Sequence, residues 1–193
     1  MTIVEAIRQL LRKDSNTRIL ACAPSNSAAD LIASRLTDLA PYELFRAYAS
    51  SRSKDEVPLE LYKYIHRNRD GHFSVPSMNK LCAFRVIVTT CVSSSMLLGV
   101  GMPSGHFTHI FIDEAGQATE PEAMIAIKTM ADDATNIILS GDPKQLGPIV
   151  RSGVARRLGL EKSYIERLME RDVYDNDLGY GTWLELFSSI LHL

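Results

Sequence analysis

The sequence predicts an α/β protein in which a parallel sheet carries helices on both faces. Short runs of apolar and β-branched residues, typical of buried strands, alternate with segments whose apolar residues recur at helical spacing. In a chain of 193 residues, this alternation favours a single sheet and a single core. Three of the predicted strands end in polar clusters. Functional residues of such sheets gather beyond the carboxyl ends of the strands.

The first predicted element is a helix at residues 2–12, where apolar residues recur every three to four positions. Residues 18–24 follow as a short buried strand. Ser25 and Ser27 are residues that cap helices well, so the next helix is expected to begin there. Its apolar stripe is expected to comprise Leu31, Ile32 and Leu36.

Residues 42–49 are predicted to form another strand, and residues 50–77 an excursion from the core. The excursion is polar, mixed in charge and interrupted by two prolines and a glycine. One helix is expected within it, near residues 59–66.

The second half of the chain continues the alternation. A β-branched strand at residues 84–90 precedes a short helix at residues 93–98. A strand at residues 107–113 ends in acidic residues, and the helix at residues 120–130 has a proline suited to its first turn. Residues 136–140 form the last predicted strand.

Composition and charge limit the classes of function. With 21 basic and 23 acidic residues, the net charge of −2 excludes a strongly basic protein that coats nucleic acid. The three cysteines lie in or beside apolar runs without the spacing of a metal site, and are expected to be reduced core residues. No apolar run approaches the roughly 20 residues that span a bilayer. We therefore expect no membrane partner and a cytoplasmic location.

Asp113 and Glu114 follow a predicted strand directly. A carboxylate at a strand end can hold Mg²⁺ against the phosphates of a nucleotide. A second carboxylate beside it can deprotonate the water that attacks the terminal phosphate. The same pair also suits a plain turn into a helix, so the pair alone leaves both interpretations open.

Longer motifs around this pair resemble those of a known family. Residues 113–122 (DEAGQATEPE) and 141–148 (GDPKQLGP) are similar to motifs II and III of superfamily 1B helicases, the group that includes the nonsense-decay helicases. Residues 23–30 (APSNSAAD) resemble motif Ia, and residues 88–95 (VTTCVSSS) resemble the next motif that contacts nucleic acid. Within the group, the sequences of these motifs are most similar to those of the Armitage-type helicases of RNA silencing.

This resemblance implies a RecA-like fold of the P-loop NTPase type and a set of nucleotide-site residues. Asp113 would hold Mg²⁺, Glu114 would activate water, and Gln145 would sense the terminal phosphate of ATP. Gln117 would help to position the phosphate or the water. Asp142 would organise the loop after the last strand, although it also suits an ordinary turn.

The resemblance also implies a nucleic-acid track. Its expected lining residues are Pro24, Ser25, Asn26, Thr89, Thr90 and Ser93. Hydroxyl, amide and backbone groups at the starts of helices suit contacts with phosphate and sugar that do not depend on base sequence. Ordinary helix capping by the serines is the alternative, and one residue can do both. The basic residues between positions 151 and 167 are expected to lie on a solvated helix face, and contact with RNA is the alternative.

Helicases of this group bind phosphates through a GxxxxGK[ST] loop, which is expected immediately before the first helix. The 193 residues contain no Gly-Lys-Ser or Gly-Lys-Thr, so the fold is expected to lack this loop and the strand before it. Residues 1–172 are thus predicted to be a partial first motor domain, and residues 173–193 a divergent apolar tail. The strand at 136–140 is then expected at an open edge. The implied strand order is 44–47, 86–90, 19–23, 109–113, 136–140.

The leading interpretation is a fragment of an ATP-dependent RNA helicase whose parent moves along single-stranded RNA. ATP and Mg²⁺ are the implied cofactors. A second motor domain and proteins of RNA silencing or RNA decay are the implied partners, and the chain alone is expected to be inactive. Two other classes remain open. One is a non-catalytic RNA- or protein-binding regulatory fragment; the other is a DNA helicase fragment, because nothing in the motifs separates ribose from deoxyribose.

Overall fold

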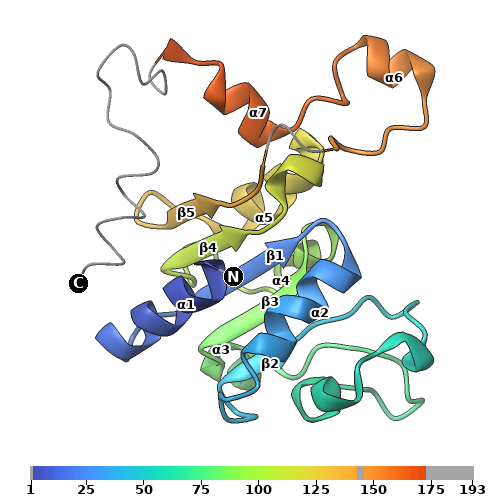
Figure 1. The fold of residues 1–193 in the computed structure, drawn as a ribbon. Coiled ribbons are helices and arrows are strands. Elements are labelled where there is room, and N and C mark those ends of the chain that lie inside the picture. The colour runs from blue at the N-terminus through green and yellow to red at the C-terminus, as the bar shows by residue number, and fades with distance from the viewer. Residues whose placement is uncertain (1, 143–145, 173–193) are drawn as a thin grey trace.

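The computed structural model of the chain describes residues 2–142 and 146–172. Within them, five parallel strands form one sheet in the order β2-β3-β1-β4-β5 (Figure 1). This order is the one that the helicase resemblance implies, so the predicted RecA-like parallel sheet is confirmed. The strands are β1 (Ile19–Ala23), β2 (Leu44–Arg46), β3 (Val86–Thr90), β4 (His109–Ile112) and β5 (Asn136–Leu139).

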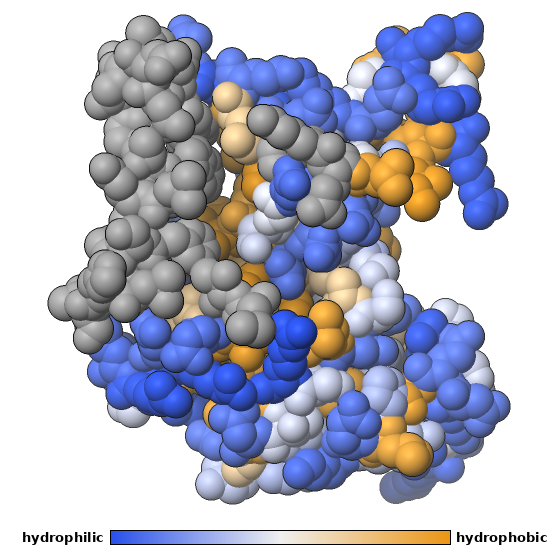
Figure 2. All heavy atoms as spheres, viewed as in Figure 1, coloured by the Kyte–Doolittle hydropathy of each residue, from blue (hydrophilic) through white to orange (hydrophobic). Residues whose placement is uncertain are grey.

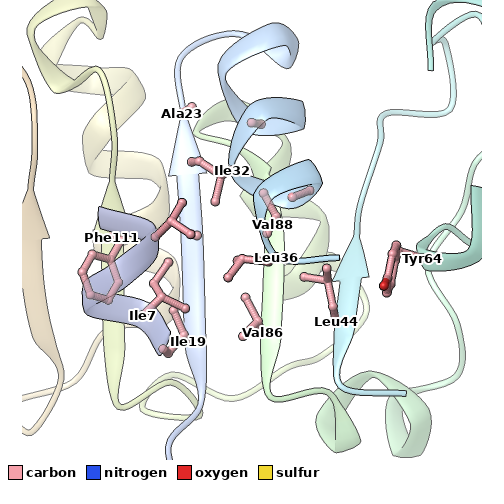
Figure 3. Packing of buried hydrophobic residues seen from close by; sticks show 14 of the residues in the cluster. Ile7, Ile19, Ala23, Ile32, Leu36, Leu44, Tyr64, Val86, Val88 and Phe111 are labelled. Atoms are coloured by element: carbon pink, nitrogen blue, oxygen red, sulfur yellow. The ribbon is translucent and has the colours of Figure 1, made fainter. Parts of the chain in front are cut away.

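One face of the sheet is covered by α1 (Thr2–Lys13) and α2 (Asn26–Arg35). Alternate residues of a strand point to opposite faces, and the odd-numbered residues of β1 belong to this cluster. Figure 3 shows Ile7 of α1 beside Ile19 of β1, and Ile32 of α2 above the same strand. Most of the apolar residues whose spacing predicted these two helices are therefore residues that the helices bury.

The other face is covered by α3 (Met78–Ala83), α4 (Ser95–Gly99) and α5 (Glu120–Met130). Leu20 and Cys22, the even-numbered residues of β1, pack into this second cluster. Both faces of a central parallel strand are thus apolar, which explains why β1 appears in the sequence as a continuous apolar run. The predicted helices on both faces are confirmed.

Three expectations about individual side chains and segments were wrong in detail. Leu31 does not belong to the apolar stripe of α2, because its side chain is 52% exposed. The predicted helix near residues 59–66 is the 3₁₀ helix η2 (Leu59–Tyr64). Nor is the segment at residues 50–77 wholly outside the core. Four of its apolar residues pack into the cluster under α2, namely Val57, Leu61, Tyr64 and Phe73.

Three short helices were not predicted: α3, α6 (Gly153–Arg157) and α7 (Tyr164–Met169). Each has five or six residues, too few for an apolar period to stand out. Among the described residues, no helix has the length and apolar character needed to cross a membrane. The predicted tail at residues 173–193 lies outside the described residues.

The strand β5 lies at the edge of the described sheet. It pairs with β4 on one side, and no other described strand pairs with it. Its exposure agrees with this position, because Asn136 is exposed and Ile137 is 40% exposed. The open edge that the sequence predicted for this strand is therefore present in the described part of the chain.

Exposed apolar side chains gather around α6. They include Leu146, Ile149, Val154 and Leu158. Apolar atoms are visible at the surface in this part of the molecule, at the upper right of the space-filling view (Figure 2). Soluble proteins tolerate single exposed apolar residues, whereas a group of them raises the tendency to associate.

Candidate nucleotide and nucleic-acid site

The polar segments after β1, β4 and β5 meet at the carboxyl edge of the sheet. These strands are parallel neighbours, so their carboxyl ends lie side by side (Figure 1). The backbone N–H of Asp113 donates to the carbonyl of Cys22 across 2.8 Å. The backbone N–H of Ala115 donates to the carbonyl of Ser140, also across 2.8 Å. The predicted convergence of the acidic loop with its two neighbours is therefore confirmed.

Glu114 has a left-handed backbone, with φ 53° and ψ 35°. It is the only non-glycine residue with a positive φ in the described part of the chain. Such a conformation costs about 1–3 kcal/mol in a non-glycine residue and persists only where neighbours enforce it. Here the hydrogen bonds of Ala115 to Ser140 and of Gln117 N–H to the Glu114 carbonyl enforce it. The chain turns sharply after Asp113, and both carboxylates stay half-buried at the edge.

The side chain of Gln117 is directed at Glu114. Its Nε2 donates to Glu114 Oε2 across 3.2 Å, and Gln117 itself is exposed. The predicted role of Gln117 was to position the phosphate or the water. In the structure, its side-chain amide bonds to the Glu114 carboxylate, and its role toward phosphate or water stays a prediction.

Gly141 allows the loop after β5 to lie against the acidic loop. A Cβ at this position would lie 2.8 Å from the nitrogen of Ala115 and 2.9 Å from that of Gly116, too close for a real side chain. Asp142 follows as an exposed residue. Gln145 lies outside the described residues, so its role as a phosphate sensor stays a prediction.

The donor set at the acidic loop suits Mg²⁺ bound with a nucleotide. Within residues 2–142 and 146–172, no cluster of three His, Cys, Asp or Glu residues could hold a metal ion alone. Mg²⁺ at nucleotide sites takes one or two carboxylates and completes its octahedron with phosphate oxygens and water. Asp113, half-buried at the end of β4, can supply such a carboxylate.

The segment after β1 is the start of α2. Ser25 is its N-cap residue, and its Oγ accepts a hydrogen bond from the backbone N–H of Ala28 across 3.1 Å. The capping interpretation of Ser25 is therefore confirmed. Pro24 and Asn26 are half-buried beside it, and Ser25 is exposed. A capping serine that is also exposed can still contact a ligand.

The end of β3 and the turn after it require a correction to the predicted nucleic-acid track. Thr89 is fully buried, and its hydroxyl donates to the carbonyl of Ala47 across 3.2 Å. Its side chain therefore joins β3 to the segment after β2 and does not face a nucleic acid. Thr90 is 8% exposed, and its Oγ1 accepts from the backbone N–H of Ser93. Ser93 is half-buried and reaches the surface. Pattern reasoning took the whole motif as surface because a strand end gives no signal of which threonine faces inward.

The segments after β1 and β3 adjoin one another. The backbone N–H of Cys91 donates to the carbonyl of Ala23 across 2.9 Å. Pro24 and the turn that contains Ser93 therefore follow from two neighbouring and hydrogen-bonded strand ends. Of the six residues predicted for the nucleic-acid track, Pro24, Ser25, Asn26 and Ser93 reach the surface, Thr90 is nearly buried, and Thr89 does not reach it.

A buried ion pair beneath the start of α2 was missed by sequence reasoning. Arg46 is fully buried, and its Nε donates to Asp30 Oδ1 across 2.8 Å. The Tyr48 hydroxyl donates to the same oxygen across 2.7 Å. An arginine inside the apolar run LFRAY was a signal for such a partner, because a charge is rarely buried unless it is paired.

The basic residues after position 150 are solvated or paired at the surface. Arg167 Nε lies 2.8 Å from Glu120 Oε2, and Lys162 pairs with Glu170. The remaining arginines of this stretch, Arg151, Arg156 and Arg157, are exposed. The arrangement agrees with the predicted solvated helix face.

Comparison with known proteins identifies relatives of the chain that contain this edge of the sheet. Residues 78–153 match a family model described as an AAA domain. The chain is 44% identical over 180 residues to the human protein named RNA helicase Mov10l1, and 38% identical over 197 residues to the Drosophila melanogaster protein named probable RNA helicase armi. Each comparison covers 92% of this chain. The bacteriophage T4 UvsW helicase structure matches 82% of this chain and 48% of its own, with 15% identity and a TM-score of 0.44.

The chain spans only 14% of the human protein and 17% of the fly protein. Nevertheless, the similarity to both covers nearly the whole of this chain. The resemblance predicted from four short motifs is thus confirmed, because the chain is similar throughout to one segment of proteins named as RNA helicases.

Proposed function

We propose that the chain is the part of an ATP-dependent RNA helicase that carries two catalytic carboxylates and one portion of the RNA-binding surface. One observation carries the proposal, namely how the acidic loop is held at the strand ends. Asp113 N–H bonds to Cys22 of β1, and Ala115 N–H, next to the strained Glu114, bonds to Ser140 at the end of β5. Both lie beside the strand ends that lead to Pro24 and Ser93. The similarity to segments of proteins named as RNA helicases supports it.

In the nucleotide half of this site, Asp113 would supply a carboxylate ligand to Mg²⁺. The ion, when bound with ATP, neutralises charge on the phosphates. Glu114 would accept a proton from the attacking water, because its carboxylate stands next to Asp113 at the same strand end. Gln117 would keep that carboxylate in one orientation through the bond from its Nε2. The chain's own residues would thus orient the base before any chemical step.

In the RNA half, Ser25, Asn26 and Ser93 would contact phosphate and sugar. These groups follow β1 and β3, and β1 is bonded to the acidic loop through Asp113 N–H and the Cys22 carbonyl. A shift of the acidic loop on nucleotide binding would therefore act directly on the strand that precedes Pro24. This connection is our account of how ATP and RNA binding would be coupled.

The proposal also includes the partners and the cellular location of the parent protein. A second motor domain in the parent protein would complete the nucleotide site, and a cytoplasmic role with proteins of RNA silencing or RNA decay would follow from the resemblance to Armitage-type helicases. Fluorescence microscopy of the tagged parent protein tests the location. Purification of its partners with and without ribonuclease tests the association.

Equilibrium binding to RNA tests the core of the proposal. Fluorescence anisotropy of a labelled single-stranded oligouridylate, titrated with the 193-residue chain, should show weak binding that weakens further as salt rises. Asn26→Ala should reduce affinity, whereas Leu31→Ala, an exposed change farther along α2, should not. Absence of binding by the unsubstituted chain would contradict the RNA assignment. Tighter binding of the matched DNA would favour a DNA helicase, and RNA binding by a parent protein that never hydrolyses ATP would favour a regulatory fragment.

A further inference from the structure

The guanidinium of Arg46 reaches three partners from inside the core. A fully buried charge is tolerated only when its donors are satisfied. Its Nε donates to Asp30 Oδ1 across 2.8 Å, and its Nη1 donates to the carbonyl of Ala47 across 2.6 Å. Its Nη2 donates to Asn26 Oδ1 across 3.0 Å. The third bond leads out of the core to the first residue of α2.

This third bond determines which end of the Asn26 amide faces the solvent. A side-chain amide has an acceptor oxygen on one side and a donor NH₂ on the other, whereas a guanidinium only donates. Arg46 therefore holds the Asn26 oxygen, and the NH₂ group lies on the opposite side of the amide. Among the described residues, none accepts a hydrogen bond from Asn26 Nδ2. The side chain is half-buried, so this donor is accessible.

We propose that Arg46 is a positioning residue for RNA binding, which holds Asn26 so that its NH₂ group donates to an oxygen of the phosphodiester backbone. This inference rests on the proposed function, in which Asn26 lines the RNA track. A donor held in this way selects the oxygen-rich backbone over any particular base. It makes the contact independent of sequence, as movement along RNA requires.

The anchor of this arrangement is Asp30 on α2. Its Oδ1 accepts from both Arg46 Nε and the Tyr48 hydroxyl, and the Tyr48 ring lies 4.0 Å from Arg46 Cζ. Lysine in place of Arg46 would keep the charge beside Asp30. However, a single ammonium at the end of a flexible stem cannot reproduce the planar set of donors that also reaches Asn26. Arg46→Lys therefore separates the charge of the pair from the orientation of the amide.

A four-way comparison tests the proposal by anisotropy with the labelled oligouridylate. The proteins are the unsubstituted 193-residue chain, Arg46→Lys, Asn26→Ala, and the variant with both changes. Each single change should weaken RNA binding by about three- to tenfold, the effect of one lost hydrogen bond of typical strength. The double variant should bind no more weakly than Asn26→Ala. Tyr48→Phe, which alters the same network but leaves the bond to Asn26, should change affinity less than twofold.

The outcomes separate this inference from the proposed function. If Arg46→Lys weakens binding by the same factor with and without Asn26, Arg46 has only a structural role and the inference is wrong. Unchanged binding of Asn26→Ala would overturn it as well. If the unsubstituted chain does not bind RNA, the proposed function fails first, and the inference falls with it.

A second measurement needs no variant and covers the case in which Arg46→Lys does not fold. The ¹⁵N relaxation of the Asn26 side-chain NH₂ in the unsubstituted chain should give an order parameter close to that of rigid backbone, about 0.85. A value below about 0.6, typical of a flexible group, would show that Arg46 does not hold the amide and would overturn the inference.

Discussion

The side-chain amide of Gln117 donates a hydrogen bond to the carboxylate of Glu114 across 3.2 Å. Glu114 is also the residue whose backbone is held in the left-handed region. One residue is therefore constrained twice, at its backbone by the neighbouring strand end and at its side chain by Gln117. Constraint of this kind suits a group that must meet a water molecule in one orientation.

Removal of the Gln117 amide should slow ATP hydrolysis without abolishing it. In a complete motor that contains this segment, Gln117→Ala should lower kcat about tenfold, because Glu114 keeps its carboxylate but loses the hydrogen bond that orients it. RNA affinity measured without nucleotide should stay within twofold. A kcat equal to that of the unsubstituted motor would show that the bond between the two side chains has no catalytic role.

At position 114, the left-handed backbone should reverse the usual order in which alanine and glycine substitutions stabilise a protein. Alanine is normally the more stable choice, but a left-handed conformation costs a residue with a Cβ about 1–2 kcal/mol. Glu114→Gly should therefore unfold at a higher denaturant concentration than Glu114→Ala in the 193-residue chain, by about 1 kcal/mol in the free energy of unfolding. If the alanine variant were the more stable, the left-handed turn would not exist in solution.

A side chain at Gly141 should disturb the acidic loop that it contacts. The Cβ of Gly141→Ala would meet the backbone nitrogens of Ala115 and Gly116, and these atoms cannot move without moving Glu114. We expect a lower melting temperature and a loss of ATP hydrolysis in the complete motor. Gly153→Ala is a matched control, because a Cβ there meets nothing within 4 Å. Equal behaviour of the two variants would contradict the close approach.

The long elements and their order could be predicted because they follow from apolar spacing and from motif similarity. The helix Glu120–Met130 was predicted with its observed bounds, with Pro121 in the first turn. The structure adds a capping box formed by Thr119 and Glu122. What could not be predicted depends on contacts between distant segments. The spacing of α2 did not show that Leu31 faces solvent, and the Val-Thr-Thr run did not show that Thr89 points inward. The role of Arg46 depends on Asp30 and Asn26, which only the folded chain brings to it.

Stability should fall as the pH is lowered through the ordinary range of histidine. Burial lowers the pKa of His106 and of His109, and the charge of Arg18 lowers that of His106 further. Below a pH of about 6.5 the unfolded chain therefore takes up protons that the folded chain does not, and unfolding becomes more favourable. The stability that the two half-buried neutral histidines contribute is fully present above that pH and is lost as the pH falls.

Melting temperatures at pH 7.5 and pH 5.5 measure this effect. The 193-residue chain should melt at a lower temperature at pH 5.5, and the variant with both His106→Gln and His109→Gln should show a smaller difference between the two values. A variant that kept the full difference would assign the pH dependence to other groups.

The central claim is that Glu114, at the carboxyl edge of this sheet, is the base of an RNA-stimulated ATPase. The direct test is a hybrid in which residues 1–172 replace the matching segment of human RNA helicase Mov10l1, with steady-state ATP hydrolysis measured with and without single-stranded RNA. We predict that the hybrid hydrolyses ATP faster with RNA. Glu114→Gln should lower its kcat by a factor of about 10²–10⁴ while ATP still binds. A Glu114→Gln hybrid that hydrolyses ATP as fast as the unsubstituted hybrid would contradict the account.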